Sequence, residues 1–305
     1  MKIRTILILL KSCAVFDLCL SNLCNFSSKN VYQGQKFSGA IVKRKETNSR
    51  LECMAFCIDR ENISFKASLC DNICFCYQNT GGKVSNTKCK SFVYELVNVN
   101  NCLDIYRCYS PGNGIYTITV NGNPLNVYCD MDGGGWTVLH RRLDGSVNFE
   151  RSYSNYKNGF GSLSGEHWLG LDNICGILSS GMYEVRFDLE DFDGVKGYAE
   201  YSIFDMADST FNYQLQISGY TGNVGDGMKV HDGMEFSAID ADNDHWPSDS
   251  CSVNYHGGWW YNNCLYANLN GLYNSTQKWE GVIWYQWRGN SYSLKTASFK
   301  IRPKQ

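Results

Sequence analysis

Beyond its N-terminus, the sequence has no apolar run of the roughly 18 residues that a transmembrane helix needs. It also has no Gly-X-Y repeat and no heptad segment, which excludes a collagen-like or coiled-coil stalk. Charged residues make up only 19% of the chain, against about 25% in typical soluble domains, and the formal net charge is −2. We therefore expect no membrane span and no nucleic-acid partner.

Motifs of catalysis are missing as well. The sequence contains no Ser/His/Asp order typical of a hydrolase, no His-Glu-x-x-His motif and no phosphate-binding glycine loop. The cluster Gly133-Gly134-Gly135 leads into Trp136 and has none of the residues that follow a phosphate loop. These absences predict a binding protein rather than an enzyme.

Cysteine, by contrast, is abundant: the 15 cysteines indicate an oxidising compartment. A basic start followed by an apolar run predicts a signal peptide over residues 1–14 and a secreted, extracellular protein. Cleavage after Ala14 removes one cysteine and leaves an even number, whereas cleavage after Ser21 removes two and leaves one for an intermolecular bridge. Even pairing favours the earlier site.

Two further features fit a secreted binding protein. Aromatic residues reach 14% of the chain, which favours a surface rich in tyrosine and tryptophan, as in proteins that bind sugars or other proteins. Three Asn-x-Ser/Thr sequons, at Asn25, Asn62 and Asn274, are candidate glycosylation sites.

Residues 19–97 form a cysteine-dense segment. Cys53 and Cys57 are four residues apart and follow a capping-box pattern, which predicts a short helix, and residues 75–77 and 92–94 are typical of short strands. The pattern resembles the PAN/apple module, which implies a small disulfide-rich α+β domain. An unrelated disulfide-stapled domain is the alternative. Zinc binding is less favoured, because the segment has no histidine.

After a short polar joint, residues 98–305 show a different composition and are predicted to form one domain of mixed structure. Alternating apolar residues predict strands, and the Asn121-Gly122 pair predicts a tight turn between the first two of them. The expected strands are 114–120, 127–129, 182–189 and 198–204, and a short helix is expected at 165–169.

Residues 102–303 resemble the fibrinogen C-terminal domain family closely and almost without gaps. The segments that carry the resemblance are Gly114-Ile115-Tyr116-Thr117-Ile118, Val127-Tyr128-Cys129-Asp130-Met131-Asp132, Gly165-Glu166-His167-Trp168-Leu169-Gly170-Leu171-Asp172-Asn173 and Asn268-Leu269-Asn270-Gly271-Leu272-Tyr273. The resemblance implies an α+β fold with three subdomains around a central twisted antiparallel sheet.

The family's cysteine scheme implies two disulfides, Cys102–Cys129 and Cys251–Cys264. The first disulfide would stabilise the folded domain by roughly 3–4 kcal/mol on the chain-entropy model, because closing the loop lowers the entropy of the unfolded chain. Cys108 and Cys175 are additional to that scheme, and they could pair with each other or with other cysteines.

A calcium site is predicted in the segment that ends at Cys251. Alternating carboxylates on an irregular loop can converge on a hard cation, and the resemblance implies Ca²⁺ bound by Asp242 and Asp244 with backbone carbonyls near Trp246 and Ser248. The segment before Cys251 is one residue longer than in many family members, so Asp249 is the alternative to Ser248 for the last carbonyl. An EF-hand is excluded, because Gly and Glu are absent from the two positions that require them. A solvated acidic turn is the alternative.

In lectins of the family, an aromatic-lined pocket beside the calcium binds acetyl groups. The resemblance implies a cis bond between Asn263 and Cys264, an amide donor at Cys264 and an aromatic wall at Tyr255. Two positions depart from the family pattern: Leu265 stands where acetyl-binding members often have His, and Lys278, followed by Trp279, stands where a second wall tyrosine is found. We expect these changes to shift specificity toward acidic glycans or a protein ligand.

The resemblance implies a secreted calcium-dependent pattern-recognition protein, a fibrinogen-related lectin similar to ficolins and tachylectins and acting in innate defence. The alternative is an extracellular matrix or signalling ligand that binds a protein receptor through the same domain. Because single sugar sites are weak, glycan recognition would need clustering, so the chain could form homo-oligomers.

Overall fold

The computed structural model describes residues 26–37, 41–46, 64–70, 73–77, 83–96, 99–109 and 112–304. The chain divides into two compact units, one of residues 1–99 and 104–112 and the other of residues 100–103 and 113–305. The predicted signal peptide, the predicted helix around Cys53 and the sequons at Asn25 and Asn62 lie outside the described residues.

The described part of the first unit contains a five-stranded antiparallel sheet with the strand order β1-β5-β3-β4-β2. The strands that were predicted at 75–77 and 92–94 lie within β4 and β5. The bounds are β1 (Phe26–Phe37), β2 (Ile41–Glu46), β3 (Ser64–Cys70), β4 (Ile73–Tyr77) and β5 (Lys83–Leu96).

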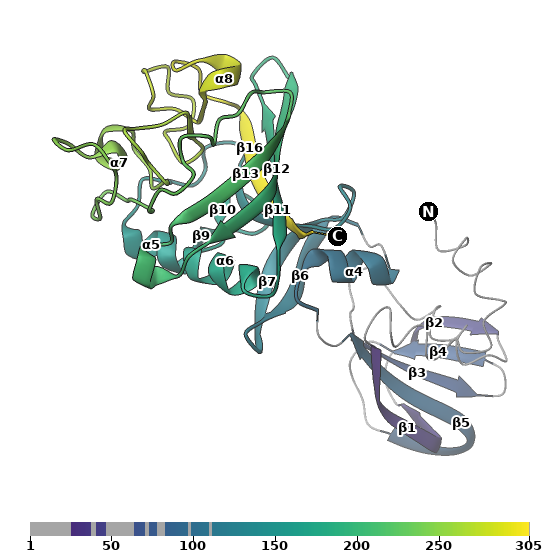
Figure 1. The fold of residues 1–305 in the computed structure, drawn as a ribbon. Coiled ribbons are helices and arrows are strands. Elements are labelled where there is room, and N and C mark those ends of the chain that lie inside the picture. Colours follow the sequence, from purple (N-terminus) through teal and green to yellow (C-terminus); the bar gives the residue numbers. More distant parts are fainter. Residues whose placement is uncertain are drawn as a thin grey trace. The chain divides into compact units, whose positions relative to one another are not determined.

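The second unit is built on a nine-stranded antiparallel sheet, and its helices are few and short (Figure 1). The path β13-β12-β11-β16-β8-β10-β9 is joined at β8 by the β6–β7 hairpin. The strands are β6 (Gly114–Val120), β7 (Asn123–Asp130), β8 (Trp136–Arg142), β9 (Phe160–Gly161), β10 (His167–Trp168), β11 (Tyr183–Glu190), β12 (Lys196–Met206), β13 (Leu215–Gly222) and β16 (Thr296–Pro303). Its remaining elements are α5 (Tyr153–Asn158), α6 (Leu171–Leu178), the 3-10 turn η2 (Ser209–Phe211), α7 (Cys251–Asn254), α8 (Tyr285–Arg288) and the small β14 (Ala267–Asn268) and β15 (Ile283–Trp284) pair. The helix α4 (Cys102–Tyr109) begins in this unit, and most of its residues belong to the first unit.

The central sheet separates an apolar face from a charged face. In β11 every second residue is buried, and Phe187 packs against Phe299 of β16 and Trp284 of β15. The loops that carry α7 and α8, green to yellow in Figure 1, gather at one end of the sheet. Two of the tryptophans in these loops, Trp259 and Trp260, are almost fully buried. The ligand-site loops are therefore anchored in the core of the domain.

Two local predictions have different outcomes. Asn121 and Gly122, with φ of 50° and 80°, make the predicted tight turn between β6 and β7. The helix expected at 165–169 is wrong, because β10 pairs His167 with Arg141 of β8 there and α6 begins only at Leu171. Strand pairing with β8 prevails over the local helical tendency.

Candidate functional site

The predicted calcium-binding segment is a loop held at its base by backbone pairing. Ser237 and Trp259 exchange two hydrogen bonds of 2.9 and 3.0 Å, and Ala238 and Ala241 close a second small bridge. The side chain of Ser237 also accepts the Asn243 N–H at 3.0 Å. Hydrogen bonds therefore fix the base of the loop that carries Asp242 and Asp244.

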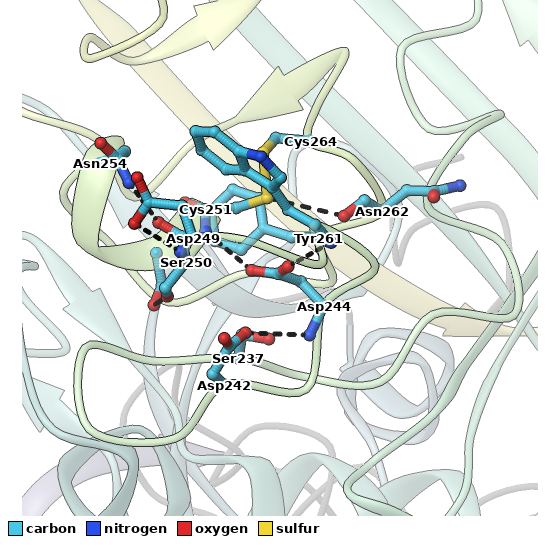
Figure 2. The surroundings of a disulfide bond; sticks show 12 residues. Ser237, Asp242, Asp244, Asp249, Ser250, Cys251, Asn254, Tyr261, Asn262 and Cys264 are labelled. Carbon is cyan, nitrogen blue, oxygen red and sulfur yellow. Dashed lines mark hydrogen bonds between the residues drawn. A yellow bond between two sulfur atoms is a disulfide. The ribbon is translucent and has the colours of Figure 1, made fainter.

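Asp244 turns its carboxylate toward the chain around Cys251 (Figure 2). One oxygen accepts the Trp246 N–H at 2.8 Å and the other accepts the Cys251 N–H at 2.7 Å. Asp242 accepts the Asp244 N–H at 3.3 Å, so the two side chains belong to one turn. Their position is set by backbone donors and does not depend on long flexible side chains.

Electrostatics at this turn favour a cation. Burial raises the pKa of the Asp244 carboxyl above its usual value, the Trp246 and Cys251 amides oppose that rise, and the negative charge of Asp242 adds to it. Asp242 is exposed, so the pair is open to solvent on that side. A divalent ion beside both carboxylates would remove their repulsion.

The donor set fits calcium better than a transition metal. Calcium takes oxygen ligands, and the turn offers two carboxylates with the backbone carbonyls of Trp246 and Ser248 close in sequence. Among the described residues, no group of three or more His, Cys, Asp or Glu side chains is placed to hold a metal. A bound ion would therefore depend on carbonyls and water for most of its ligands.

A disulfide joins this turn to the predicted ligand pocket. Cys251 and Cys264 are bonded, with their Cα atoms 5.7 Å apart, and the Asn263–Cys264 peptide bond is cis. The His245 N–H donates to the Asn262 carbonyl at 3.0 Å, and the Asn262 N–H donates to the Cys264 carbonyl at 2.8 Å. The aspartate turn and the pocket loop thus form one hydrogen-bonded unit.

The predicted aromatic wall also contacts the aspartate turn. The Tyr255 ring is half-buried and stacks on the Trp246 ring, with centroids 6.5 Å apart and an interplanar angle of 17°. The Asn268 side-chain amide donates to the Tyr255 carbonyl at 2.8 Å and fixes the wall from below. Trp246 therefore packs its ring against this wall, and its role as a carbonyl ligand of calcium stays a prediction.

The other predicted pocket residues differ in their surroundings. Leu265 is only 7% exposed, so it offers a ligand little surface. Lys278 is exposed, and Trp279 is half-buried against Tyr285 at 5.0 Å between centroids. The Tyr255 ring contacts Trp246, whereas the Trp279 ring contacts Tyr285. The structure therefore shows no ring contact that joins the two predicted pocket aromatics among the described residues.

The remaining cysteine and glycosylation predictions have mixed outcomes. The Cys102–Cys129 disulfide is present, with a Cα separation of 5.6 Å. Cys175 is a free thiol, so neither of the two alternatives for it, a disulfide with Cys108 or with another cysteine, is found. Burial raises the pKa of the Cys175 thiol, and the carboxylates around it add to this rise, which disfavours the thiolate that disulfide exchange requires. Asn274 is exposed, as a glycan acceptor must be.

Sequence reasoning missed two exposed tyrosines in this region. Tyr266 and Tyr285 are 37% and 42% exposed and stack on each other, with centroids 5.7 Å apart. They are far apart in sequence and meet because the short β14–β15 pair brings their chains together. The position of Tyr266 two residues after Cys264 was the available signal.

Residues 98–304 match the family described as the C-terminal globular domain of fibrinogen beta and gamma chains. The chain belongs to this family. The match covers the whole nine-stranded unit and both loops of the candidate site.

Relatives in the fibrinogen family are extracellular. Fibrinogen C domain-containing protein 1-B of Xenopus laevis is 43% identical over 217 residues, 67% of this chain and 47% of that protein. Tenascin of Gallus gallus is 44% identical over 196 residues, 63% of this chain and 11% of that protein. The fibrinogen-like globe domain of human ANGPTL2 has a TM-score of 0.66 at 39% identity, covering 68% of this chain and 100% of that chain. The chain spans about half, or less, of the length of these curated relatives.

The relatives limit the range of functions. The fibrinogen domain proteins, tenascins and angiopoietin-like proteins are non-enzymatic, which agrees with the prediction of a binding protein. Fibrinogen-like domains bind protein or other ligand partners. No helix among the described residues combines the length and apolarity required to cross a membrane.

Proposed function

We propose that this fibrinogen-domain protein is a secreted, calcium-dependent glycan-binding protein of the fibrinogen-related lectin type, with a role in innate defence. The observation that carries the proposal is the Asp244 carboxylate. It accepts amides from both ends of the turn, at Trp246 and Cys251, and so couples a cation-binding turn to the disulfide of the pocket loop. A cation bound there would stiffen the surface beside it without any chemical step.

In this proposal the ion is Ca²⁺, held by the Asp242 and Asp244 carboxylates and by the carbonyls of Trp246 and Ser248. Bound calcium would supply positive charge and rigidity to the turn. The protein's own contribution is the hydrogen-bonded path from Asp244 to Cys264 and the Tyr255 ring that stacks on Trp246. Ligand binding would therefore depend on whether calcium occupies the turn.

The ligand we propose is an N-acetylated or acidic glycan. Tyr255 provides an aromatic wall, and the Asn263–Cys264 backbone lies at the rim of the same loop. Buried Leu265 cannot supply the polar contact that a histidine would give, whereas exposed Lys278 offers a cation to a carboxylate or sulfate. These two positions favour an acidic group over a neutral one.

A second candidate function is a matrix or signalling ligand for a protein receptor. The kinship with tenascin and with the globe domain of ANGPTL2 favours it. The proposed N-terminal disulfide-rich module at 19–97, of PAN/apple type, would serve either function. It could also join chains into homo-oligomers, which would raise the avidity of weak sugar sites.

The test is binding of the full chain to a glycan array and to whole microbes, with calcium and with a chelator. We expect binding that chelation abolishes and that Asp242→Asn reduces at least tenfold. Asp240→Asn is the matched control, because Asp240 accepts the Tyr153 N–H outside the proposed ligand set. Glycan binding that persists at full strength under chelation would contradict the calcium dependence, and binding to a protein receptor with no glycan binding would replace this proposal with the second candidate.

A further inference from the structure

Phe192 is an exposed aromatic residue at the surface of the fibrinogen unit. It lies in the turn between β11 and β12, and it is 45% exposed. Its ring meets the Tyr273 ring with the centroids 6.2 Å apart and an interplanar angle of 65°. Such an edge-type contact covers at most one face of one ring. Much of the Phe192 ring therefore presents apolar surface to solvent.

Tyr273 is the fixed support of that ring. The Tyr273 hydroxyl lies 3.1 and 3.0 Å from the carbonyl oxygens of Leu143 and Lys295 and can donate to either. A Cβ on Gly145 would lie 2.6 Å from Cδ1 of Tyr273, so the Gly145 main chain packs against the Tyr273 ring. Of the two rings, Phe192 is the one that is open to a partner.

A glycosylation sequon begins beside these rings, at Asn274. Asn274 directly follows Tyr273, and its N–H donates to Oγ of Ser293 at 3.1 Å. The residue before Ser293, Tyr292, accepts the Phe192 N–H at its hydroxyl at 2.9 Å. Two separate sets of contacts, one through Tyr273 and one through Tyr292, thus connect Asn274 to Phe192. The acceptor residue and the exposed ring lie in the same small region of the surface.

The side-chain amide of Asn274 is available for a sugar. Four asparagines of the neighbouring loops each donate their side-chain amide to a backbone carbonyl at 2.7 to 3.1 Å: Asn254, Asn262, Asn268 and Asn270. The Asn274 side chain is exposed and makes no hydrogen bond with any described residue. Its φ of 58° lies in the left-handed region, which asparagine tolerates better than most residues. The turn therefore holds an unengaged amide at the surface.

The charges beside the Phe192 ring favour a neutral partner with hydroxyl groups. Buried Asp191 pairs with Arg288, and Lys295 pairs with Glu190 at 3.3 Å. Exposed Asp193 makes no ion pair with a described residue. The hydroxyl and amide groups of a neutral sugar can donate hydrogen bonds to that carboxylate, whereas an acidic partner would be repelled.

We propose that Asn274 carries an N-linked glycan whose first sugar packs on the exposed Phe192 ring. In the modification, Nδ2 of Asn274 forms a bond to C1 of an N-acetylglucosamine. The C1–oxygen bond of a lipid-diphosphate-linked oligosaccharide donor breaks, Nδ2 gives up one proton, and the lipid diphosphate leaves.

Two effects favour the contact between the sugar and Phe192. Covering an exposed ring with the apolar face of a sugar removes apolar surface from water. Because the sugar is already tethered, the contact does not cost the translational freedom of a separate ligand. The inference needs a secreted chain but neither calcium nor the ligand pocket, so it can fail or hold independently of the proposed glycan-binding function.

The full chain, secreted from cultured animal cells, tests the proposal first at the sequon. Peptide mapping should find a glycan on Asn274 in the unmodified chain and in Thr276→Ser, which keeps the sequon, but not in Thr276→Ala. We expect the unfolding midpoint of Thr276→Ala to be about 2–4 °C lower than that of Thr276→Ser. Thr276→Ala is preferred to Asn274→Gln, because glutamine would add backbone strain at a φ of 58°.

Phe192→Ala then tests the contact itself. In the Phe192→Ala background, Thr276→Ala should no longer shift the midpoint. Phe211→Ala, at a phenylalanine of η2 that is 64% exposed, is the matched control and should leave the shift intact. An Asn274 without a glycan, a Thr276→Ala variant as stable as Thr276→Ser, or an equal shift with and without the Phe192 ring would overturn the proposal.

Discussion

At the scale of single residues, Glu166 organises the loop after β8. One oxygen accepts the N–H groups of Leu143, Asp144 and Gly145 at 2.8 to 3.2 Å, and the other accepts the Val147 N–H at 2.9 Å. Burial would raise the pKa of Glu166, but these amides and nearby Arg142 lower it below its usual value. The carboxylate is therefore ionised at neutral pH.

Glu166→Gln should reduce the free energy of unfolding by about 3 kcal/mol, because it leaves the buried Arg142 guanidinium without its anion. Urea unfolding at pH 7 measures the loss. Glu200→Gln, at a partly exposed ion pair, should cost less than about 1 kcal/mol. Equal losses in the two variants would contradict this role for Glu166.

Cys175 should be a slow thiol. Burial and then the charges of Asp208 and Asp172 raise its pKa, so little thiolate is present at pH 7.4. Labelling with iodoacetamide, followed by peptide mapping, should be several-fold slower at Cys175 than in a cysteine-containing model peptide. Asp208→Asn should speed it. A rate equal to the peptide's would show that these surroundings do not control the thiol.

At the scale of elements, the main chain at Gly271 lies very close to the main chain at Gly281, next to the bridge between Leu272 and Gly281. A Cβ on Gly271 would lie 2.1 Å from the Gly281 carbonyl oxygen, which is main chain and has little freedom to move. Gly271→Ala should therefore destabilise the domain by about 2 kcal/mol or more. Gly181→Ala, where nothing lies within 4 Å, is the control and should be near neutral in thermal unfolding. Similar melting temperatures for the two variants would disprove this close approach as a constraint.

Sequence pattern predicted elements whose signals are local. The β6–β7 hairpin follows from Asn121-Gly122, and β11 and β12 follow from period-two alternation. The helix expected at 165–169 failed because the pairing of β10 with β8 is a long-range contact. The contact between Tyr266 and Tyr285 was missed for a similar reason, since the β14–β15 pairing brings these two residues together. Features that depend on contacts between distant segments leave no local pattern in the sequence, so one sequence does not predict them.

At the scale of the whole molecule, buried neutral histidines make the free energy of unfolding depend on pH. Burial lowers the pKa of both His167 and His231 to about 4, although backbone contacts partly oppose the shift. The unfolded chain binds these protons near pH 6.5, so stability is complete above that pH and falls as the pH drops toward 4. Each histidine should lower the free energy of unfolding by about 2 kcal/mol as the pH falls from 7 to 5.

Urea unfolding at those two pH values tests the linkage, and His231→Gln should flatten the dependence. In the neutral ring, Nδ1 lies 2.6 Å from the Trp260 carbonyl and Nε2 accepts the Ala267 N–H at 3.1 Å, an arrangement that a second ring proton would break. If the free energy of unfolding of the variant depends on pH as steeply as that of the unmodified chain, His231 does not contribute to the linkage.

The central claim is that Asp242 and Asp244 hold a calcium ion that supports the pocket loop. Calorimetric titration of calcium into the metal-free full chain tests it most directly. We predict one ion bound per chain, a rise in the unfolding temperature with calcium, and loss of both in Asp242→Asn but not in Asp240→Asn. No heat of binding at millimolar calcium, or binding that Asp242→Asn leaves unchanged, would contradict the claim.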